Sequence, residues 1–266
     1  MSDESQSQKI SVVINTYNAE RDLPRCLGAL KGFDEIVVCD MESTDSTVAI
    51  AQEAGCKVVT FPRGEHRICE PARDFAIHSA TNDWVLVVDA DEIVTPELKD
   101  YLYKVIADAD CPAGLCVARK NHVYGVFLPF SYPDYQLRFL RQSLTTWPPV
   151  VHSRPQINGE VRNIPKERDE LAMLHMPHFS EAESISKTNA YTDNEAFVKK
   201  KGKRASFGKL IFSPFFRFFR FYVLKGGFRL GRLGFILACN DAIYKFVFLA
   251  KLYEAERMEE LNKKGE

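Results

Sequence analysis

The sequence predicts an α/β protein whose first hundred residues form a mainly parallel sheet with helices on both faces. Apolar runs of strand length alternate there with segments of helical spacing, as in successive β–α units. The runs lack polar alternation, which indicates strands that are buried on both faces. With 266 residues, of which 45% are hydrophobic and 27% charged, the chain is long and apolar enough to bury a core without disulfides or a structural metal.

Four strand–helix units justify this prediction in order. The expected strands are 9–16, 35–39, 57–61 and 84–88, and the expected helices are 20–30, 47–54, 70–80 and 96–107. Gly32 and Gly55 follow the first two helices as stop signals, and Pro96 suits the first turn of the fourth. In an open sheet of this kind, ligands bind beyond the carboxyl ends of the strands.

The pattern changes after residue 113. Strand-like pieces at 114–119, 136–140 and 171–175 are separated by Pro-rich and aromatic loops, which predicts a mixed-sheet extension whose loops build a substrate pocket. A further helix is expected at 181–200. We therefore expect a single catalytic domain over residues 1–200, followed by a basic, Phe-rich helical segment over residues 201–266.

Polar and acidic residues follow three of the predicted strands. The first strand runs into NTYN, the second into Asp40 and MESTDST, and the fourth into Asp89, Ala90 and Asp91. Asp89 and Asp91 are two residues apart, so they share one side of the strand end. Two such carboxylates suit Mg²⁺ or Mn²⁺, which can neutralise a diphosphate, and Asp40 can accept a hydrogen bond from a base or a ribose.

Simpler explanations exist for each acidic cluster taken alone. The DADE segment could be a solvated turn, and STDST is a good helix N-cap sequence. The joint occurrence of three clusters at successive strand ends favours a ligand site. No Gly-rich phosphate loop follows the first strand, which argues against a nucleotidyltransferase.

The segments VVINTYNAERDLPRCLGAL, DEIVVCDMESTDSTVAIA, ARDFAI and DWVLVVDADEIVTPEL resemble glycosyltransferase family 2, whose members are inverting enzymes with the GT-A fold. The resemblance is strongest to the bacterial branch that adds hexoses to the lipopolysaccharide core. It is close over residues 10–98 and looser over residues 132–178. It implies a GT-A-like catalytic domain, a nucleotide-sugar donor that is most often a UDP-sugar, and Mg²⁺ or Mn²⁺ as cofactor.

The resemblance also implies roles for single residues. Asp89 and Asp91 match the metal-binding DxD motif of the family, and His175 or His178 would complete the metal shell. A structural or surface role for either histidine remains open. The nucleotide would be bound by Thr16, Tyr17, Glu20, Asp40, Arg73 and Asp89, with Asp40 at the base and Arg73 at the uracil or the diphosphate.

The catalytic base implied by the resemblance is Asp134, in the YPDY loop. It would deprotonate the acceptor hydroxyl opposite the leaving diphosphate. The family often has a Glu-Asp pair where this chain has Pro133 and Asp134, so Glu160, Glu92 and His152 remain alternatives. Arg138 would bind the diphosphate or hold the loop by an ion pair.

The C-terminal part is basic and aromatic although the whole chain has a net charge of -1. Residues 196–240 contain eleven of the 35 basic residues and none of the 36 acidic ones, and residues 207–248 contain eleven of the 19 phenylalanines. A helix with this composition can lie at an anionic membrane surface. A buried helical hairpin is the alternative. Nucleic acid is not an expected partner, because these Phe rows are flanked by Leu and Ile rather than by a polar groove.

The sequence thus predicts a cytoplasmic enzyme that lies peripherally on the inner face of the cell membrane. The N-terminus has no secretory signal, no run of about 18 uncharged apolar residues occurs, and the seven scattered cysteines suit a reducing compartment. The reaction that the resemblance implies moves a hexose, with glucose as the first choice, from a UDP-sugar to a lipid-linked glycan such as the lipopolysaccharide core. The alternatives are a polyprenyl-linked or capsular acceptor, and a non-catalytic membrane-surface adaptor, which would have no use for Asp89 and Asp91.

Overall fold

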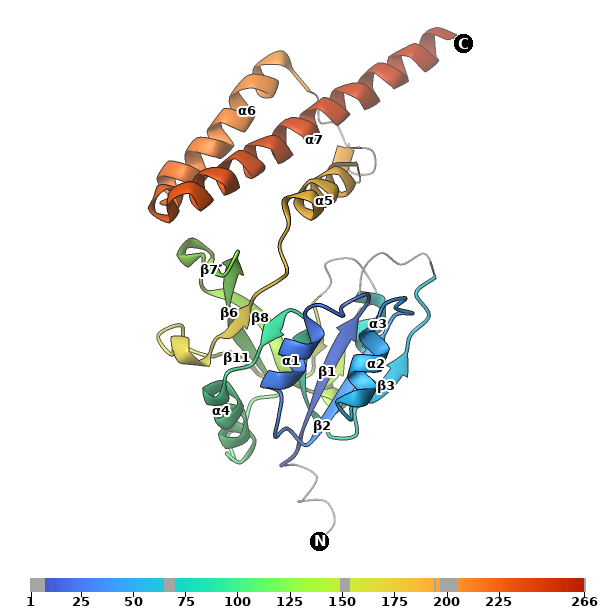
Figure 1. The fold of residues 1–266 in the computed structure, drawn as a ribbon, viewed down its shortest axis with the longest axis vertical. Coiled ribbons are helices and arrows are strands. Elements are labelled where there is room, and N and C mark those ends of the chain that lie inside the picture. Colours follow the sequence, from blue (N-terminus) through green and yellow to red (C-terminus); the bar gives the residue numbers. More distant parts are fainter. Residues whose placement is uncertain (1–7, 65–69, 149–153, 194, 197–204, 266) are drawn as a thin grey trace. The chain divides into compact units, whose positions relative to one another are not determined.

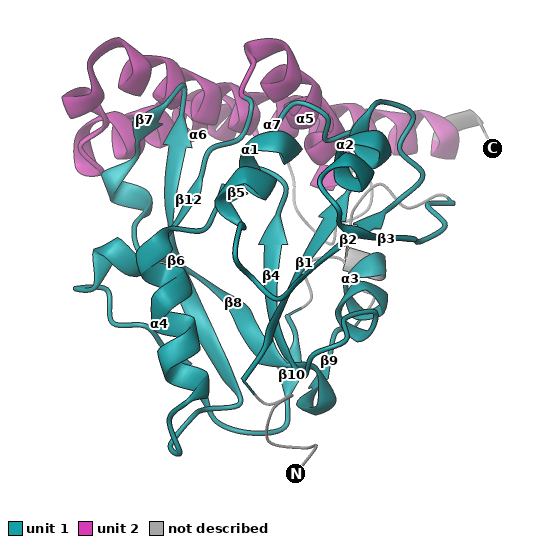
Figure 2. Ribbon diagram, turned by 60° about the horizontal axis from the view of Figure 1, so that its bottom comes forward, with its two compact units in different colours: residues 1–178 teal, residues 179–266 magenta. Residues whose placement is uncertain are grey.

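The structure is a computed structural model that describes residues 8–64, 70–148, 154–193, 195–196 and 205–265. The chain forms two compact units, residues 1–178 and residues 179–266, which are described separately here (Figure 2). The boundary expected after residue 200 falls within 197–204, outside the described residues.

Four parallel strands form one half of the sheet in the first unit (Figure 1). Strand β1 (Ile10–Thr16) is buried at every residue, which explains its mainly apolar sequence. Its register pairs Thr16 with Asp40 and Asn15 with Asp89, so the three polar strand ends meet at one edge, as the sequence predicted. In the order in which they pair, the strands are β3 (Lys57–Thr60), β2 (Glu35–Asp40), β1 (Ile10–Thr16) and β4 (Trp84–Asp89).

Helices cover both faces of this sheet, as expected. Alternate residues of β1 belong to two cores. Val12 and Ile14 pack with α1 (Leu23–Ala29), α2 (Thr47–Glu53) and α4 (Pro96–Ile106), whereas Val13 packs with α3 (Glu70–His78) and Trp147. The Thr95 hydroxyl caps α4 by accepting a hydrogen bond from the Leu98 amide at 3.2 Å.

The other half of the sheet is mixed, as predicted for the residues after 113. From β4 the order continues through β8 (Asp134–Arg141), β6 (Gly114–Val123), β12 (Met173–His175) and β5 (Glu92–Ile93). Strand β5 was not predicted, because a two-residue strand has no periodicity to detect. Its pairing with β12 places the acidic segment that follows β4 beside the last strands of the mixed half of the sheet.

Shorter elements complete this unit. Strands β7 (Val126–Phe127) and β11 (Val161–Asn163) pair with β6, and β9 (Thr145–Thr146) pairs with β10 (Gln156–Ile157). Short 3₁₀ turns lie at Pro129–Ser131, Gln142–Leu144 and Asp169–Leu171.

The second unit is helical and contains an antiparallel hairpin of α6 and α7 (Figure 1). The closing turn is tight, because a Cβ on Gly234 would lie 1.8 Å from the Gly227 carbonyl oxygen. Helix α5 is tied to α7 by a 3.0 Å hydrogen bond from the Asn240 amide to Glu181. The elements are α5 (Glu181–Asp193), α6 (Phe207–Phe219), a π-helical turn (Arg220–Leu224), a 3₁₀ turn (Gly227–Leu230) and α7 (Gly231–Gly265).

The helical segment 227–263 is long and apolar enough to cross a membrane, judged by length and composition alone. This differs from the expectation that no helix is apolar enough to span, which rested on charged residues such as Asp241 and Lys245 within the apolar run. The segment does form a hairpin, as the second alternative expected. No residue of α6 is buried, whereas Ala238, Phe248, Leu249 and Leu252 of α7 are buried, so the burial of the hairpin stays a prediction.

Candidate active site

The ends of β1 and β2 hold a buried carboxylate, Asp40, which is 2% exposed. It accepts hydrogen bonds from the Thr16 hydroxyl at 3.0 Å, the Ser43 amide at 2.8 Å and the Ser43 hydroxyl at 2.6 Å. A carboxylate offers about four acceptor positions, so these three bonds orient Asp40 and leave one for a ligand.

The loops after β1 and β2 are bound to each other around Asp40. Asn18 accepts a hydrogen bond from the Thr44 amide at 2.8 Å, and Glu20 accepts one from the Ser46 amide at 3.1 Å. The Arg63 guanidinium lies 3.5 Å from the centre of the Tyr17 ring. The structure therefore gathers the predicted nucleotide residues Thr16, Tyr17, Glu20 and Asp40 at one place.

Asp89, at the end of β4, is bound by two guanidinium groups. Arg73 of α3 donates to its Oδ1 at 2.9 Å, and Arg138 of β8 donates to its Oδ2. Burial alone would raise the pKa of Asp89, but the charges of Arg138 and Arg73 lower it below its ordinary value. Asp89 is therefore a carboxylate held ionised within an arginine pair.

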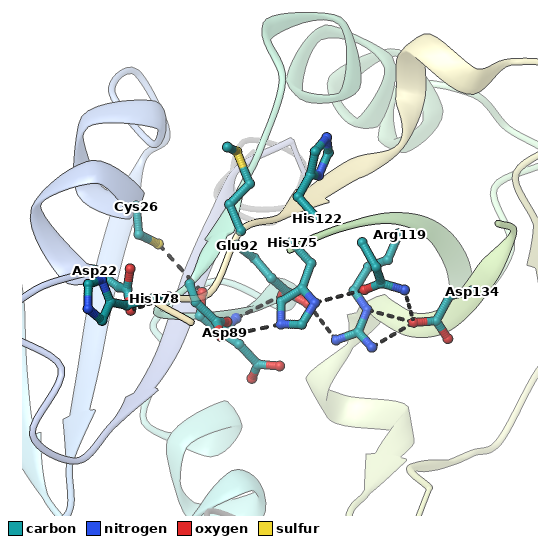
Figure 3. Close-up of polar contacts among 12 residues, drawn as sticks. Asp22, Cys26, Asp89, Glu92, Arg119, His122, Asp134, His175 and His178 are labelled. Carbon is teal, nitrogen blue, oxygen red and sulfur yellow. Dashed lines mark hydrogen bonds and ion pairs between the residues drawn. The ribbon is translucent and has the colours of Figure 1, made fainter. Parts of the chain in front are cut away.

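A chain of alternating acids and guanidinium groups continues from Asp89 (Figure 3). Glu92 has no exposed surface, and its Oε1 accepts from Arg138 at 2.7 Å and from Arg119 at 3.2 Å. Burial raises the pKa of Glu92 despite the opposing charge of Arg138. Arg119 also donates to Asp134, at 3.0 Å from Nε and 2.6 Å from Nη2. The chain thus links the end of β4 to the predicted base.

Asp134 lies at the start of β8, directly opposite Arg119 in the register of β6 and β8. Besides Arg119, the amides of Asn121 and Gln136 donate to it at 3.1 and 2.9 Å. Burial would raise the pKa of Asp134, but the hydrogen bonds from Asn121 and Arg119 lower it. Its side chain is still 29% exposed, so it is an ionised carboxylate that a ligand can reach.

Asp91 and His175 form a second pair at this edge, with Oδ2 and Nε2 3.2 Å apart. Strand pairing produces this arrangement, since His175 of β12 lies opposite Asn121 of β6 and Glu92 of β5. The Asn121 Nδ2 donates to Asp134, so its Oδ1 faces His175 Nδ1, at 2.7 Å. Nδ1 therefore carries hydrogen, and in the neutral ring the Nε2 lone pair faces the Asp91 carboxylate.

This pair fits a divalent cation. Neighbouring ligands of an octahedral Mg²⁺ or Mn²⁺ lie about 3 Å apart, since metal–oxygen distances are about 2.1 Å. Asp91 Oδ2 and His175 Nε2 could both serve as ligands of such an ion, and Asn121 orients the histidine as an outer-sphere partner would. Within the described residues, no three His, Cys, Asp or Glu side chains converge on one point. Two protein ligands suffice for Mg²⁺, which usually retains waters and binds substrate phosphates.

The remaining predicted residues lie in different surroundings. The role of Asp89 as a metal ligand stays a prediction, and in the structure both of its oxygens accept hydrogen bonds from arginine. The competing base Glu160 is exposed and paired with Arg162, and His152 lies outside the described residues. The His178 amide lies 3.4 Å from Asp22, in the vicinity of α1.

Sequence reasoning missed Arg119, Asn121 and Gln136. Arg119 and Asn121 are two residues apart on β6, and Asp134, Gln136 and Arg138 repeat at the same spacing on β8, so each set shares one face of its strand. The available signal was the polar residues at alternate positions of β8, since the polar residues of β6 form a continuous run, RKNH, that shows no alternation.

Comparisons with known proteins identify the family and support the fold class. The family model for Glycosyl transferase family 2 matches residues 11–228. The chain is 31% identical over 253 residues to the lipopolysaccharide core biosynthesis glycosyltransferase LpsC of Rhizobium meliloti, which covers 92% of both chains. It is 29% identical over 264 residues to an uncharacterized glycosyltransferase of Rickettsia felis, which covers 93% of this chain and 90% of the relative.

Among solved structures, S. aureus TarS 1-349 in complex with UDP-GlcNAc has a similar fold. It aligns with 94% of this chain and 92% of its own, at a TM-score of 0.50 and 17% identity. The predicted GT-A-like fold class is confirmed, and so is the resemblance on which it rested.

Proposed function

Because this chain belongs to glycosyl transferase family 2, we propose that it transfers a hexose, glucose in the first instance, from a UDP-sugar to a hydroxyl group of a lipid-linked glycan. The acceptor class we favour is the lipopolysaccharide core, as in the name of the relative LpsC. The observation that carries the proposal is the grouping of an Asp91–His175 pair, an arginine-bound Asp89 and an accessible Asp134 at one sheet edge.

The donor nucleotide would bind at the ends of β1 and β2. Asp40 keeps one acceptor position for the base or the ribose, and Tyr17 directly follows Thr16, the residue that pairs with Asp40 in the sheet. Arg73 Nη1 is buried and has no hydrogen-bond partner among the described residues, which suits a donor to the diphosphate or the uracil.

Mg²⁺ or Mn²⁺ would be held by Asp91 and His175, and it would supply charge neutralisation to the leaving diphosphate. Other residues of the chain would fix the charge and the orientation of the groups around the ion. Arg138 and Arg73 keep Asp89 ionised and fixed, and Asn121 holds the imidazole of His175 in one tautomer. The contacts of Asp89 and His175 thus lie between the proposed nucleotide site at Asp40 and the proposed base Asp134.

Asp134 would remove the proton from the attacking acceptor hydroxyl, on the side away from the diphosphate. Such in-line attack gives inversion, as the family implies. Its lowered pKa keeps Asp134 ionised at neutral pH, although it makes the carboxylate a weak base. Proton transfer would therefore accompany bond formation, when the hydroxyl becomes acidic.

The proposed location is the cytoplasmic face of the cell membrane, where a lipid-linked acceptor can be reached. A polyprenyl-linked or capsular intermediate is the second acceptor class. The first test is a panel of sugar nucleotides with Mn²⁺ or Mg²⁺, scored for release of free nucleotide. A non-catalytic adaptor would release none with any donor or metal, and that result would overturn the proposal.

Asp134→Asn is expected to lower kcat by about 10²–10⁴-fold while the dissociation constant for UDP changes less than about threefold. The amide keeps the shape of the side chain but cannot accept the proton. Turnover and calorimetric UDP binding give the two values. Equal losses in both would show that Asp134 is structural.

Arg119→Gln is expected to move the acidic limb of the pH profile of kcat/KM to higher pH. The hydrogen bonds from Arg119 lower the pKa of Asp134, so their loss raises it, and the variant becomes inactive at a pH where the wild type still works. Arg119→Lys keeps the charge and should shift the limb less. An unchanged limb in Arg119→Gln would exclude Asp134 as the group that titrates.

A further inference from the structure

One side of α6 carries exposed apolar side chains along the whole helix. Its residues recur at spacings of three and four, so they lie on one side of the helix. They are 41–77% exposed, and they are Phe207, Ile211, Phe212, Phe215, Phe216 and Phe219. Contiguous exposed apolar surface of this kind marks an interaction site.

Helix α7 has a similar exposed row. Phe235, Ile236, Ile243 and Phe246 are each 41–51% exposed, and the first and last of them are eleven residues apart, three turns of helix. Helices α6 and α7 lie side by side in the hairpin, and each carries one of the two exposed rows (Figure 1). We call them together the apolar hairpin face.

Charged residues are paired within the helical unit. Arg217 of α6 binds Asp241 of α7 with Nη1 and Oδ1 2.5 Å apart, and both side chains are half-buried. The helices are held together by this ion pair and by apolar contacts, such as Phe218 with Phe235 and Leu210 with the buried cluster around Phe248. Six large apolar side chains of α6 nevertheless stay exposed, and no residue of α6 is buried. An exposed apolar side of this kind suits contact with lipid.

We propose that the α6–α7 hairpin is embedded in the plane of one leaflet of an anionic membrane, with the apolar hairpin face in the acyl region. This inference deepens the membrane location given under the proposed function and rests on it only for the identity of the membrane. It replaces simple attraction to the surface by insertion of a defined face.

Spanning is inconsistent with α6. Lys209 and Arg217 confine its uncharged stretch to Leu210–Phe216, about 10 Å of helix against about 30 Å of hydrocarbon. A hairpin that crossed the bilayer would also carry the cationic turn between its helices to the far side.

An orientation in the plane keeps the cations at the headgroups. Exposed basic residues occur along α6 and around the hairpin turn, where long side chains can reach the interface while their stems lie on apolar surface. No acidic residue occurs between 196 and 240, so the segment complements anionic lipid. These exposed residues are Lys209, Arg220, Lys225, Arg229 and Arg232.

The first experiment measures co-sedimentation with phosphatidylcholine vesicles that contain about a third phosphatidylglycerol. The triple variant Phe212→Ser, Phe215→Ser, Phe216→Ser should bind about 100-fold more weakly than wild type, because it loses the rings that enter the acyl region. The matched control is Ile185→Ser, Tyr191→Ser on α5, which removes exposed apolar groups elsewhere in the unit and should bind as wild type does. Circular dichroism checks that both variants fold.

The second experiment measures depth. Single Phe207→Trp, Phe215→Trp and Phe228→Trp variants report from one end, the middle and the turn of the hairpin, and brominated lipids quench them according to depth. The native Trp84 and Trp147 are 6% and 7% exposed, so they add a constant background. Equal quenching depths support the in-plane hairpin, and a graded series from headgroup to midplane would overturn it in favour of spanning.

Two further outcomes would overturn the inference. One is unchanged vesicle binding by the triple serine variant. The other is a defined dimer without vesicles that the same variant dissociates, which would make the apolar hairpin face a contact between two copies. Release of nucleotide from the donor in solution is measured in parallel. Its absence in the wild type would refute the proposed function and leave the vesicle result standing.

Discussion

Asp91→Asn is expected to lower transferase turnover by at least about 10³-fold and to leave the fold intact. A divalent ion contributes several kcal/mol to a reaction with a diphosphate leaving group, and about 1.4 kcal/mol is a factor of ten. Asp91 and His175 are the two facing acceptors that fit the ion, and the amide removes the charge of one. Release of nucleotide and binding of Mn²⁺ are the two measurements.

The matched control is Asp100→Asn, an exposed carboxylate on α4 that should have no effect on either measurement. His175→Gln should weaken Mn²⁺ binding in the same way as Asp91→Asn. Turnover by Asp91→Asn above about a tenth of wild type would contradict the metal assignment, because it would leave less than about 1.4 kcal/mol for the ion.

Arg138→Met is expected to lower the free energy of unfolding by about 3–5 kcal/mol, the usual cost of leaving a buried charge without its partner. Arg138 is 4% exposed and binds both Asp89 and the fully buried Glu92. Methionine would fill the space of the aliphatic chain without supplying any donor. Urea unfolding measures the loss.

A second variant separates charge from packing. Adding Glu92→Gln to Arg138→Met removes one of the stranded carboxylates, so the double variant should regain part of the lost stability. If the double variant were less stable than the single one by the full cost of Glu92→Gln, the two residues would be energetically independent.

The parallel half of the sheet was predictable because its strands are buried on both faces and therefore read as apolar runs. The approach of Asp40 to Asp89 followed from the same reasoning, since parallel strands end at one edge. The strand with Asp134 was recognised only from residue 136 onward, because its first residues are polar.

What could not be predicted depends on pairing between distant strands. Arg119 meets Asp134 only through the register of β6 with β8, and His175 meets Asp91 only because β12 pairs with the two-residue β5. Composition also could not show that α6 leaves most of its phenylalanines exposed, since a buried helix has the same residues. The burial of Arg138 between Asp89 and Glu92 follows from the fold rather than from any local motif.

The shared guanidinium groups have a consequence for how this site can vary. Arg138 serves Asp89 and Glu92, and Arg119 serves Glu92 and Asp134, so no member can be exchanged without altering the surroundings of the next. Substitutions here should show strong epistasis. A redesign of donor preference will therefore require that a carboxylate and the arginine that binds it are changed together.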